Sequence, residues 1–380
     1  MKANRFHGLD TLRATAIILV FIFHCVGATK NPILGAIGAR GGWVGVELFF
    51  VLSGYLIANQ IFSTFIKRTP FSLKTFFFRR FIRTLPNYLF VLGLYFTLPF
   101  FCERPLTTPL WKFLTFTQNF GLNFSGFSHA WSLCIEEQFY FFLPVIALII
   151  AKKSTVRTGW LIICFILLAG VFLRGSLWLT YIQQAEESKI HIYMTKIYYA
   201  SFCRLDGLVL GVSIAMLRNF HQRLWAKMIQ QGHWFMMIGL LGCYFTFYHL
   251  PDHLGFISTA FGYLIRAASF AAITLAALSP NTLLHRIKIP GAMTISVWSY
   301  AIYLTHKQII HMTQLLLPYL AIENTSMIAL MINVLLSLIG GWLLYTCIEA
   351  PCLKFRDKDG KAKLTEQAMT TNKLPEYLLN

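Results

Sequence analysis

The stretch Leu9–Val26, LDTLRATAIILVFIFHCV, is apolar, with an arginine near its start and a histidine near its end. Its composition predicts a membrane-spanning helix. Arg13 and His24 are eleven positions apart, about three helical turns plus roughly 20°, so they share one face. The rise between them is roughly 16 Å, about half of a bilayer core. Polar groups are costly at such depth, so the pair suggests a functional path through the membrane. Alternatively, Arg13 extends to lipid headgroups and His24 bonds a neighbouring helix.

The composition of the whole chain is that of a membrane protein. Of its 380 residues, 56% are hydrophobic and 13% are charged, and the mean hydropathy is +0.59, too apolar for a soluble domain of this length. The net charge is +18, but the basic residues lie between apolar runs, where they orient a membrane protein, so we expect no nucleic-acid partner. The eight cysteines form no C-x-x-C pair and are expected to be small core residues.

Apolar runs predict an all-α bundle of about ten transmembrane helices. Most of the 33 lysines and arginines fall on the side of the N-terminus, which predicts that both termini are cytoplasmic. Cleavage of the first run as a signal peptide would remove the Arg13/His24 face, so we expect the run to be retained. Residues 1–356 are expected to form one membrane domain and 357–380 a polar cytoplasmic tail. The runs are 11–28, 43–62, 84–102, 130–151, 158–178, 198–217, 233–250, 257–279, 293–318 and 326–349.

The second run, GGWVGVELFFVLSGYLIAN, combines small residues with one carboxylate. Gly41 and Gly45 have a spacing that permits close contact with another helix. Glu47 lies among apolar residues in the same half of the membrane as His24. There it could orient the imidazole or balance its charge.

Basic residues precede the third run in the stretch FFFRRFIRTLP. Arg80 and Arg83 are three positions apart and share a helical face at the cytoplasmic edge. Two planar guanidinium groups on one face suit a multiply charged phosphate ligand. Anchoring of a cytoplasmic loop is the alternative explanation for the same residues.

The fourth run opens with HAWSLCIEEQFY and contains two adjacent carboxylates. His129 and Glu136 are seven positions apart and share a face, which Glu137 cannot join. Neighbouring carboxylates in a membrane need a proton or a cation, and for Glu137 we expect a structural pair with an in-span cation such as Arg204.

The last two runs also carry polar residues. SYAIYLTHK in the ninth run places Tyr303 and His306 three positions apart on one face. The tenth run closes with YTCIEAP, where Pro351 is expected to end the helix. His24, His129 and His306 come from separate runs and no two have the helical spacing of metal ligands, so no metal is expected.

Together these motifs resemble the membrane acyltransferase-3 family of sugar O-acyltransferases, which includes bacterial O-antigen acetylases. The resemblance extends from LDTLRATAIILVFIFH to the IEAP end. It implies acetyl-CoA as the usual acyl-CoA donor and a hydroxyl of a cell-envelope carbohydrate, such as lipopolysaccharide O-antigen, as acceptor. It also implies a multi-pass protein surrounded by lipid in the bacterial inner membrane. Part of the family carries a periplasmic hydrolase-like domain after the tenth run, and its absence here disfavours acceptors that need it.

Carried over residue by residue, the resemblance places the first-span pair of the family on Arg13 and His24. The arginine pair of the inner loop falls on Arg80 and Arg83, and the acidic position of the second span falls on Glu47. These five residues are the expected catalytic and donor-binding groups. The other in-span polar residues are assigned to the substrate path or to structural pairing: His129, Trp131, Ser132, Glu136, Glu137, Arg204, Tyr303 and His306.

The mechanism expected from the sequence places CoA phosphates on Arg80 and Arg83 and extends the thioester arm from Arg13 toward His24. His24 then acts as general base for the sugar hydroxyl. A covalent relay through His24 or Cys25 stays open, although Cys25 lies about 100° round the helix. A proton-coupled transporter is the alternative class, because proton relays also use in-span Glu, Arg and His. No cofactor is expected besides the acyl-CoA donor.

Overall fold

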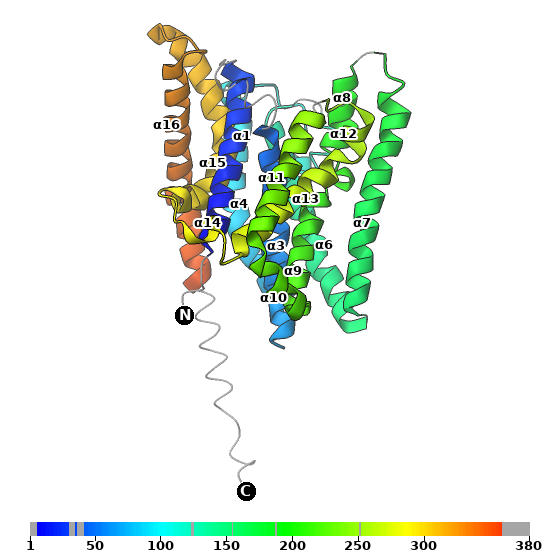
Figure 1. The fold of residues 1–380 in the computed structure, drawn as a ribbon. Helices are drawn as coiled ribbons and strands as arrows, with labels where there is room; N and C mark the ends of the chain where they lie inside the picture. The colour runs from blue at the N-terminus through cyan, green and yellow to red at the C-terminus, as the bar shows by residue number, and fades with distance from the viewer. Residues whose placement is uncertain are drawn as a thin grey trace.

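A computed structural model of the chain describes residues 6–29, 35, 42–122, 125–153, 155–186, 188–250 and 252–358. Every regular element in these ranges is a helix or a helical turn, which confirms the all-α prediction. The long helices lie side by side in one bundle, with α16 at one edge and α7 at the other (Figure 1). The start of α1 and the end of the last helix lie at the same end of the bundle.

A helix occupies each of the ten predicted runs. The long helices are α1 (His7–Thr29), α3 (Gly45–Ile66), α4 (Leu73–Thr97), α6 (Trp131–Lys153), α7 (Val156–Leu177), α9 (Asp206–Phe220), α11 (Gly232–His249), α13 (Gly262–Leu278), α15 (Ala292–Leu316) and α16 (Met327–Leu344). The short ones are α5 (Leu110–Leu114), α8 (Lys189–Tyr193), α10 (Gln222–Gln230), α12 (Phe256–Ala260) and α14 (Leu283–Arg286).

Five helical stretches among the described residues are long and apolar enough to cross a membrane. The remaining helices are shorter or more polar than this criterion allows, so the number of spans and the side on which the termini lie stay predictions. The five stretches are His7–Thr29, Gly45–Ile66, Ser128–Lys152, Val156–Ile182 and Met327–Lys358.

Two predicted boundaries are wrong, and turn geometry explains both. The run predicted over 198–217 is interrupted by the 3₁₀ turn Ser201–Cys203, and α9 begins only at Asp206. The last helix does not end at Pro351 but continues to Lys358, so the first two residues of the expected tail are helical. A π-turn over Tyr345–Glu349 precedes the proline, and its wider hydrogen-bond register accommodates a residue that lacks an N–H group. The rest of the predicted tail lies outside the described residues.

Close backbone contacts fix α1 and α9 against α3. A Cβ atom added at Gly45 would lie 2.4 Å from the Ala16 carbonyl oxygen, and one added at Gly54 would lie 2.0 Å from the Leu208 carbonyl oxygen. Only glycine permits these approaches, which confirms the close contact predicted from Gly45. Gly41, the other glycine of that prediction, lies outside the described residues. On its other side α1 packs along α15, so its polar face is held between two helices.

Candidate active site

Three histidines from distant parts of the chain meet at one end of the bundle. His24 and His129 line a cavity of about 930 Å³, which we call the histidine cavity. The ring centroid of His306 lies 4.9 Å from that of His24 and 5.6 Å from that of His129. The rings of His24 and His129 are 6.3 Å apart. Within the described residues, no group of histidine, cysteine or acidic side chains has a geometry that could hold a metal ion.

The hydrogen bonds of His306 and His24 determine which ring nitrogen carries the proton. Nδ1 of His306 lies 3.0 Å and 2.9 Å from the carbonyl oxygens of Ile302 and Tyr303, and carbonyls only accept, so this nitrogen is protonated. Nε2 of neutral His306 is therefore an acceptor, 3.0 Å from Nδ1 of His24. Nδ1 of His24 is also 3.0 Å from the Val20 carbonyl, so it donates to both. The free lone pair of neutral His24 is consequently on Nε2.

His129 is held through its backbone rather than through its ring. The Tyr303 hydroxyl donates to the His129 carbonyl, so in the hydrogen bond of 2.7 Å between Ser132 and Tyr303 the serine is the donor. The His129 side chain is 4% exposed, and neither ring nitrogen has a hydrogen-bond partner in the described part of the chain. Leaving a buried polar group unsatisfied costs about 1–3 kcal/mol, so this ring calls for an explanation.

A second cavity, of about 670 Å³, lies around the first half of α1 and the start of α4. We call it the arginine cavity. Its lining contains one acidic residue, Asp357, and five arginines: Arg13, Arg79, Arg80, Arg83 and Arg356. Arg356 was not predicted, because it follows the proline at which the helix was expected to end.

The two arginines predicted to bind phosphate differ in their contacts. Arg80 lies 3.6 Å from the Glu137 carboxylate and 4.0 Å from that of Glu136, with its guanidinium 3.7 Å from the centre of the Tyr140 ring. The predicted Glu137–Arg204 pair is therefore wrong, because the rotation of α6 turns Glu137 toward α4. Arg83 is exposed and makes no hydrogen bond or ion pair within the described residues.

Glu136 is fixed by neutral donors as well as by Arg80. The Ser53 hydroxyl donates to Oε1 over 3.0 Å, and the Tyr140 hydroxyl donates to Oε2 over 3.1 Å. These contacts tie α6 to α3 at the wall of the arginine cavity, which Ser53 and Tyr140 both line. Glu136 and His129 therefore serve different cavities, although the helical period puts them on one face.

Packed side chains separate the two cavities, which share no lining residue. Ile17 and Val20 occupy the α1 face between Arg13 and His24, and each is 1% exposed. They belong to one buried cluster with Phe50 and Trp131, and Trp131 also forms part of the wall of the histidine cavity.

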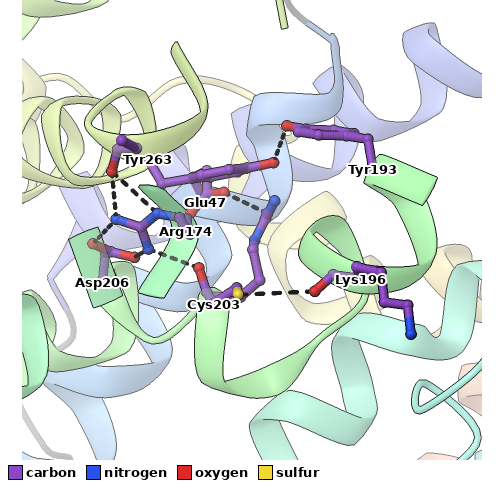
Figure 2. Close-up of polar contacts among 9 residues, drawn as sticks. Glu47, Arg174, Tyr193, Lys196, Cys203, Asp206 and Tyr263 are labelled. Carbon is purple, nitrogen blue, oxygen red and sulfur yellow. Dashed lines mark hydrogen bonds and ion pairs between the residues drawn. The ribbon is translucent and has the colours of Figure 1, made fainter. Parts of the chain in front are cut away.

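Buried ion pairs form a third polar region, between α3, α7, α9 and α13 (Figure 2). Glu47 pairs with Arg204, so the predicted interaction with His24 is not the contact that the structure gives. Arg174 and Asp206 form a bidentate pair, with nitrogen–oxygen distances of 2.7 and 3.1 Å. The sequence showed Arg174 only as a charge inside an apolar run, a signal that could have identified a buried pair.

Guanidinium groups of this region also contact aromatic rings of the histidine cavity. Arg204 lies 5.0 Å from the centre of the Trp131 ring, and Arg266 lies 4.6 Å from that of Trp43, both within cation–π range. Burial, and secondarily the Arg266 charge, lowers the pKa of His253 in the loop before α12, so this cavity-lining histidine is neutral at neutral pH.

The fold and site define a multi-pass helical membrane protein with a cluster of histidines at one end of a bundle and a cluster of arginines at the other. A family model described as an acyltransferase domain matches residues 6–346, and the chain belongs to this acyltransferase-3 family. It is similar to the peptidoglycan O-acetyltransferase OatA of Listeria monocytogenes, with 29% identity over 371 residues that cover 91% of this chain and 55% of that protein.

A second relative is the O-acetyltransferase OatA of Staphylococcus aureus, with 24% identity over 366 residues, covering 91% of this chain and 57% of the relative. A putative O-acetyltransferase of Staphylococcus aureus strain COL is 26% identical over 377 residues, covering 93% and 58%. This chain thus spans little more than half the length of these relatives. No solved structure matches the chain.

Proposed function

We propose that this protein transfers an acyl group, acetyl from acetyl-CoA, to a hydroxyl of a cell-envelope carbohydrate. The observation that carries the proposal is the tautomer of His24. Its Nδ1 proton is engaged by Val20 and His306, and its Nε2 lone pair belongs to a side chain that lines a cavity large enough for a sugar unit. A general base must present such a lone pair to its substrate.

The chemistry assigned to His24 is removal of the proton from the acceptor hydroxyl as its oxygen attacks the thioester carbonyl. An alcohol is a poor nucleophile at neutral pH, and a positioned imidazole typically contributes about 10²- to 10⁴-fold to such a step. His306 supports this role, because its Nε2 accepts a hydrogen bond from Nδ1 of His24 and so stabilises the imidazolium that forms.

The donor is assigned to the arginine cavity. Arg13 and Arg83 line it without ion-pair partners among the described residues, and free guanidinium groups suit the phosphates of CoA. Arg80 anchors this wall through Glu137 instead of binding the donor alone. Basic residues are more frequent in the loops at this end of the bundle, which supports placing the arginine cavity on the cytoplasmic side of the bacterial inner membrane.

The acyl arm has to pass Ile17 and Val20 to reach His24, a distance of roughly 16 Å along α1. Because these side chains are packed in the structure, transfer requires their separation when the donor is bound. Movements of this kind commonly complete an active site only after substrate binds.

Lipopolysaccharide O-antigen is the first candidate acceptor, on the resemblance described above. Peptidoglycan is the second, because it is named for the Listeria relative. Both are carbohydrates that would reach the histidine cavity from the side opposite the arginine cavity. Mass spectrometry of the two polymers from cells with and without the gene distinguishes them, because acetylation should be lost from one alone.

His24→Gln is the decisive test of the proposal. Glutamine has similar hydrogen-bonding capacity but accepts no proton near neutral pH, so membranes carrying this variant should transfer acetyl from acetyl-CoA at least about 100-fold more slowly than the native protein. His233→Gln, on the exposed side of α11, is the matched control. Transfer by His24→Gln within a few-fold of the native rate would exclude His24 as the base.

A further inference from the structure

The imidazole of His129 has no assigned role, although it lies beside the proposed base. It lines the histidine cavity, is 4% exposed, and has both ring nitrogens unpartnered among the described residues. A neutral imidazole carries one N–H donor and one lone pair. This side chain therefore offers a buried, unused donor within 6.3 Å, centre to centre, of the His24 ring.

The surroundings of His129 fix its position but leave its nitrogens free. Tyr303 binds the backbone carbonyl, Ser132 donates to the Tyr303 hydroxyl, and the Phe127 ring contacts the imidazole edge-on at 5.2 Å. A histidine needed only for packing would have its polar atoms satisfied by such neighbours. The Leu304 backbone lies near the ring without meeting hydrogen-bond geometry, so the neighbours hold the residue and leave the ring donor available to a ligand.

We propose that His129 is a second catalytic residue, which donates a hydrogen bond to the thioester carbonyl oxygen as negative charge develops there. The inference rests on the proposed acyl transfer. His24 and His129 line one cavity with their ring centroids 6.3 Å apart, so a thioester carbonyl placed between the two rings would have His24 available to the attacking hydroxyl and His129 available to the carbonyl oxygen. A donor preorganised in a site shielded from water stabilises an oxyanion far more than water does.

The step balances without a further reactant. The acceptor oxygen bonds to the carbonyl carbon while its proton moves to Nε2 of His24, and the carbonyl electron pair moves to the oxygen that His129 stabilises. When that pair returns, the carbon–sulfur bond breaks and the thiolate takes the proton from His24. The products are the O-acetylated carbohydrate and free CoA, and both histidines regain their initial states.

Substitutions at position 129 also distinguish hydrogen-bond donation from proton transfer. Glutamine keeps an N–H donor but cannot act as a base, so His→Gln should have unlike effects at the two positions. At His24 it removes the essential lone pair. At His129 it retains the essential donor, whereas leucine removes it. Loss of one oxyanion donor typically lowers kcat by about 10²- to 10³-fold.

The experiment measures kcat and KM for acetyl-CoA and for the acceptor in the purified full-length protein and its His129→Leu, His129→Gln and His24→Gln variants. We expect His129→Leu to lower kcat by about 10²-fold or more with both KM values nearly unchanged, and His129→Gln to recover at least about tenfold of that loss. His24→Gln should show no such recovery. His233→Leu is the control for loss of a histidine away from both cavities.

Three results would overturn the assignment. A raised acceptor KM at unchanged kcat would make His129 a binding residue for the carbohydrate. Native kcat in both His129 variants would leave it a packing residue. Equal losses for glutamine and leucine would indicate proton transfer instead of donation. Normal activity of His24→Gln, with the expected His129 pattern, would reject the proposed base and keep the donor.

If His129→Leu fails to fold, as judged by its elution and thermal midpoint in detergent, Tyr303→Phe replaces it. This variant keeps the His129 ring but removes the hydrogen bond to its carbonyl. A misplaced donor should lower kcat at unchanged KM, and native kcat in Tyr303→Phe would reject the assignment.

Discussion

The arginine cavity and the histidine cavity have similar volumes, about 670 and 930 Å³, but opposite chemistry. Five guanidinium groups line the first, whereas apolar side chains, aromatic rings and histidines line most of the second, where Lys307 is paired with Glu103. Cations suit the binding of a phosphorylated donor, but a cation next to a histidine disfavours its protonation and weakens it as a base. In the proposed mechanism one helix supplies a residue to each cavity, because Arg13 and His24 are roughly 16 Å apart along α1.

The prediction that the two cavities open on opposite sides of the membrane can be tested by a labelling experiment with an all-or-none result. Tyr319→Cys lies in the turn after α15, 88% exposed, and Asp357→Cys lies in the last helix beside the arginine cavity. We expect a membrane-impermeant maleimide to label the first variant in intact cells and the second only after permeabilisation. The parent protein measures labelling of the native cysteines. Labelling of Asp357→Cys in intact cells would place the arginine cavity outside and reject a cytoplasmic donor site.

Substitutions in the buried ion pairs should lower the stability of the protein, whereas substitutions in the two cavities should change its kinetics. Glu47→Leu leaves Arg204 as an uncompensated buried charge, and we expect a loss of about 3–5 kcal/mol in the free energy of unfolding. Chemical denaturation in detergent measures this loss. The double variant Glu47→Leu/Arg204→Leu should regain part of it, because no charge is left unpaired. A fully stable Glu47→Leu protein would reject the structural role.

Arg83→Gln tests the arginine cavity separately. Because Arg83 makes no hydrogen bond or ion pair in the described part of the chain, its loss should raise KM for acetyl-CoA by about tenfold or more while kcat stays within a few-fold of native. Arg157→Gln, at the exposed start of α7, is the control. Arg80 is a poor choice for this test, since its substitution also leaves Glu137 unpaired. A loss of kcat at unchanged KM would show that Arg83 does not act by binding the donor in the arginine cavity.

The smallest effect is expected at Lys307, which lines the histidine cavity and pairs with Glu103. Both side chains are partly exposed, and such pairs contribute about 0–1 kcal/mol. Lys307→Gln should therefore change the acceptor KM by no more than about fivefold. A far larger rise in the acceptor KM would show that the Lys307 ammonium group binds an anionic acceptor directly.

The sequence predicted the face shared by Arg13 and His24 because helical period alone determines it. It also predicted that Tyr303 and His306 share a face of α15, but not that these residues hold His129 and His24 respectively. That arrangement depends on how α15 is rotated against α1 and α6, which tertiary packing decides. The same limit explains the mistaken partner of Glu47: its place in the second apolar run was predictable, but the direction in which α3 presents the carboxylate was not.

The packed segment between the cavities also bears on the energy stored across the membrane. Two cavities that enter one bundle from opposite ends would dissipate a proton gradient if a continuous chain of water connected them. Ile17 and Val20, with Phe50 behind them, leave no polar side chain on this part of the α1 face to carry a proton from one cavity to the other. On the α1 side, a proton could therefore cross only where water enters this segment, and an acyl arm that fills the opening would keep water out.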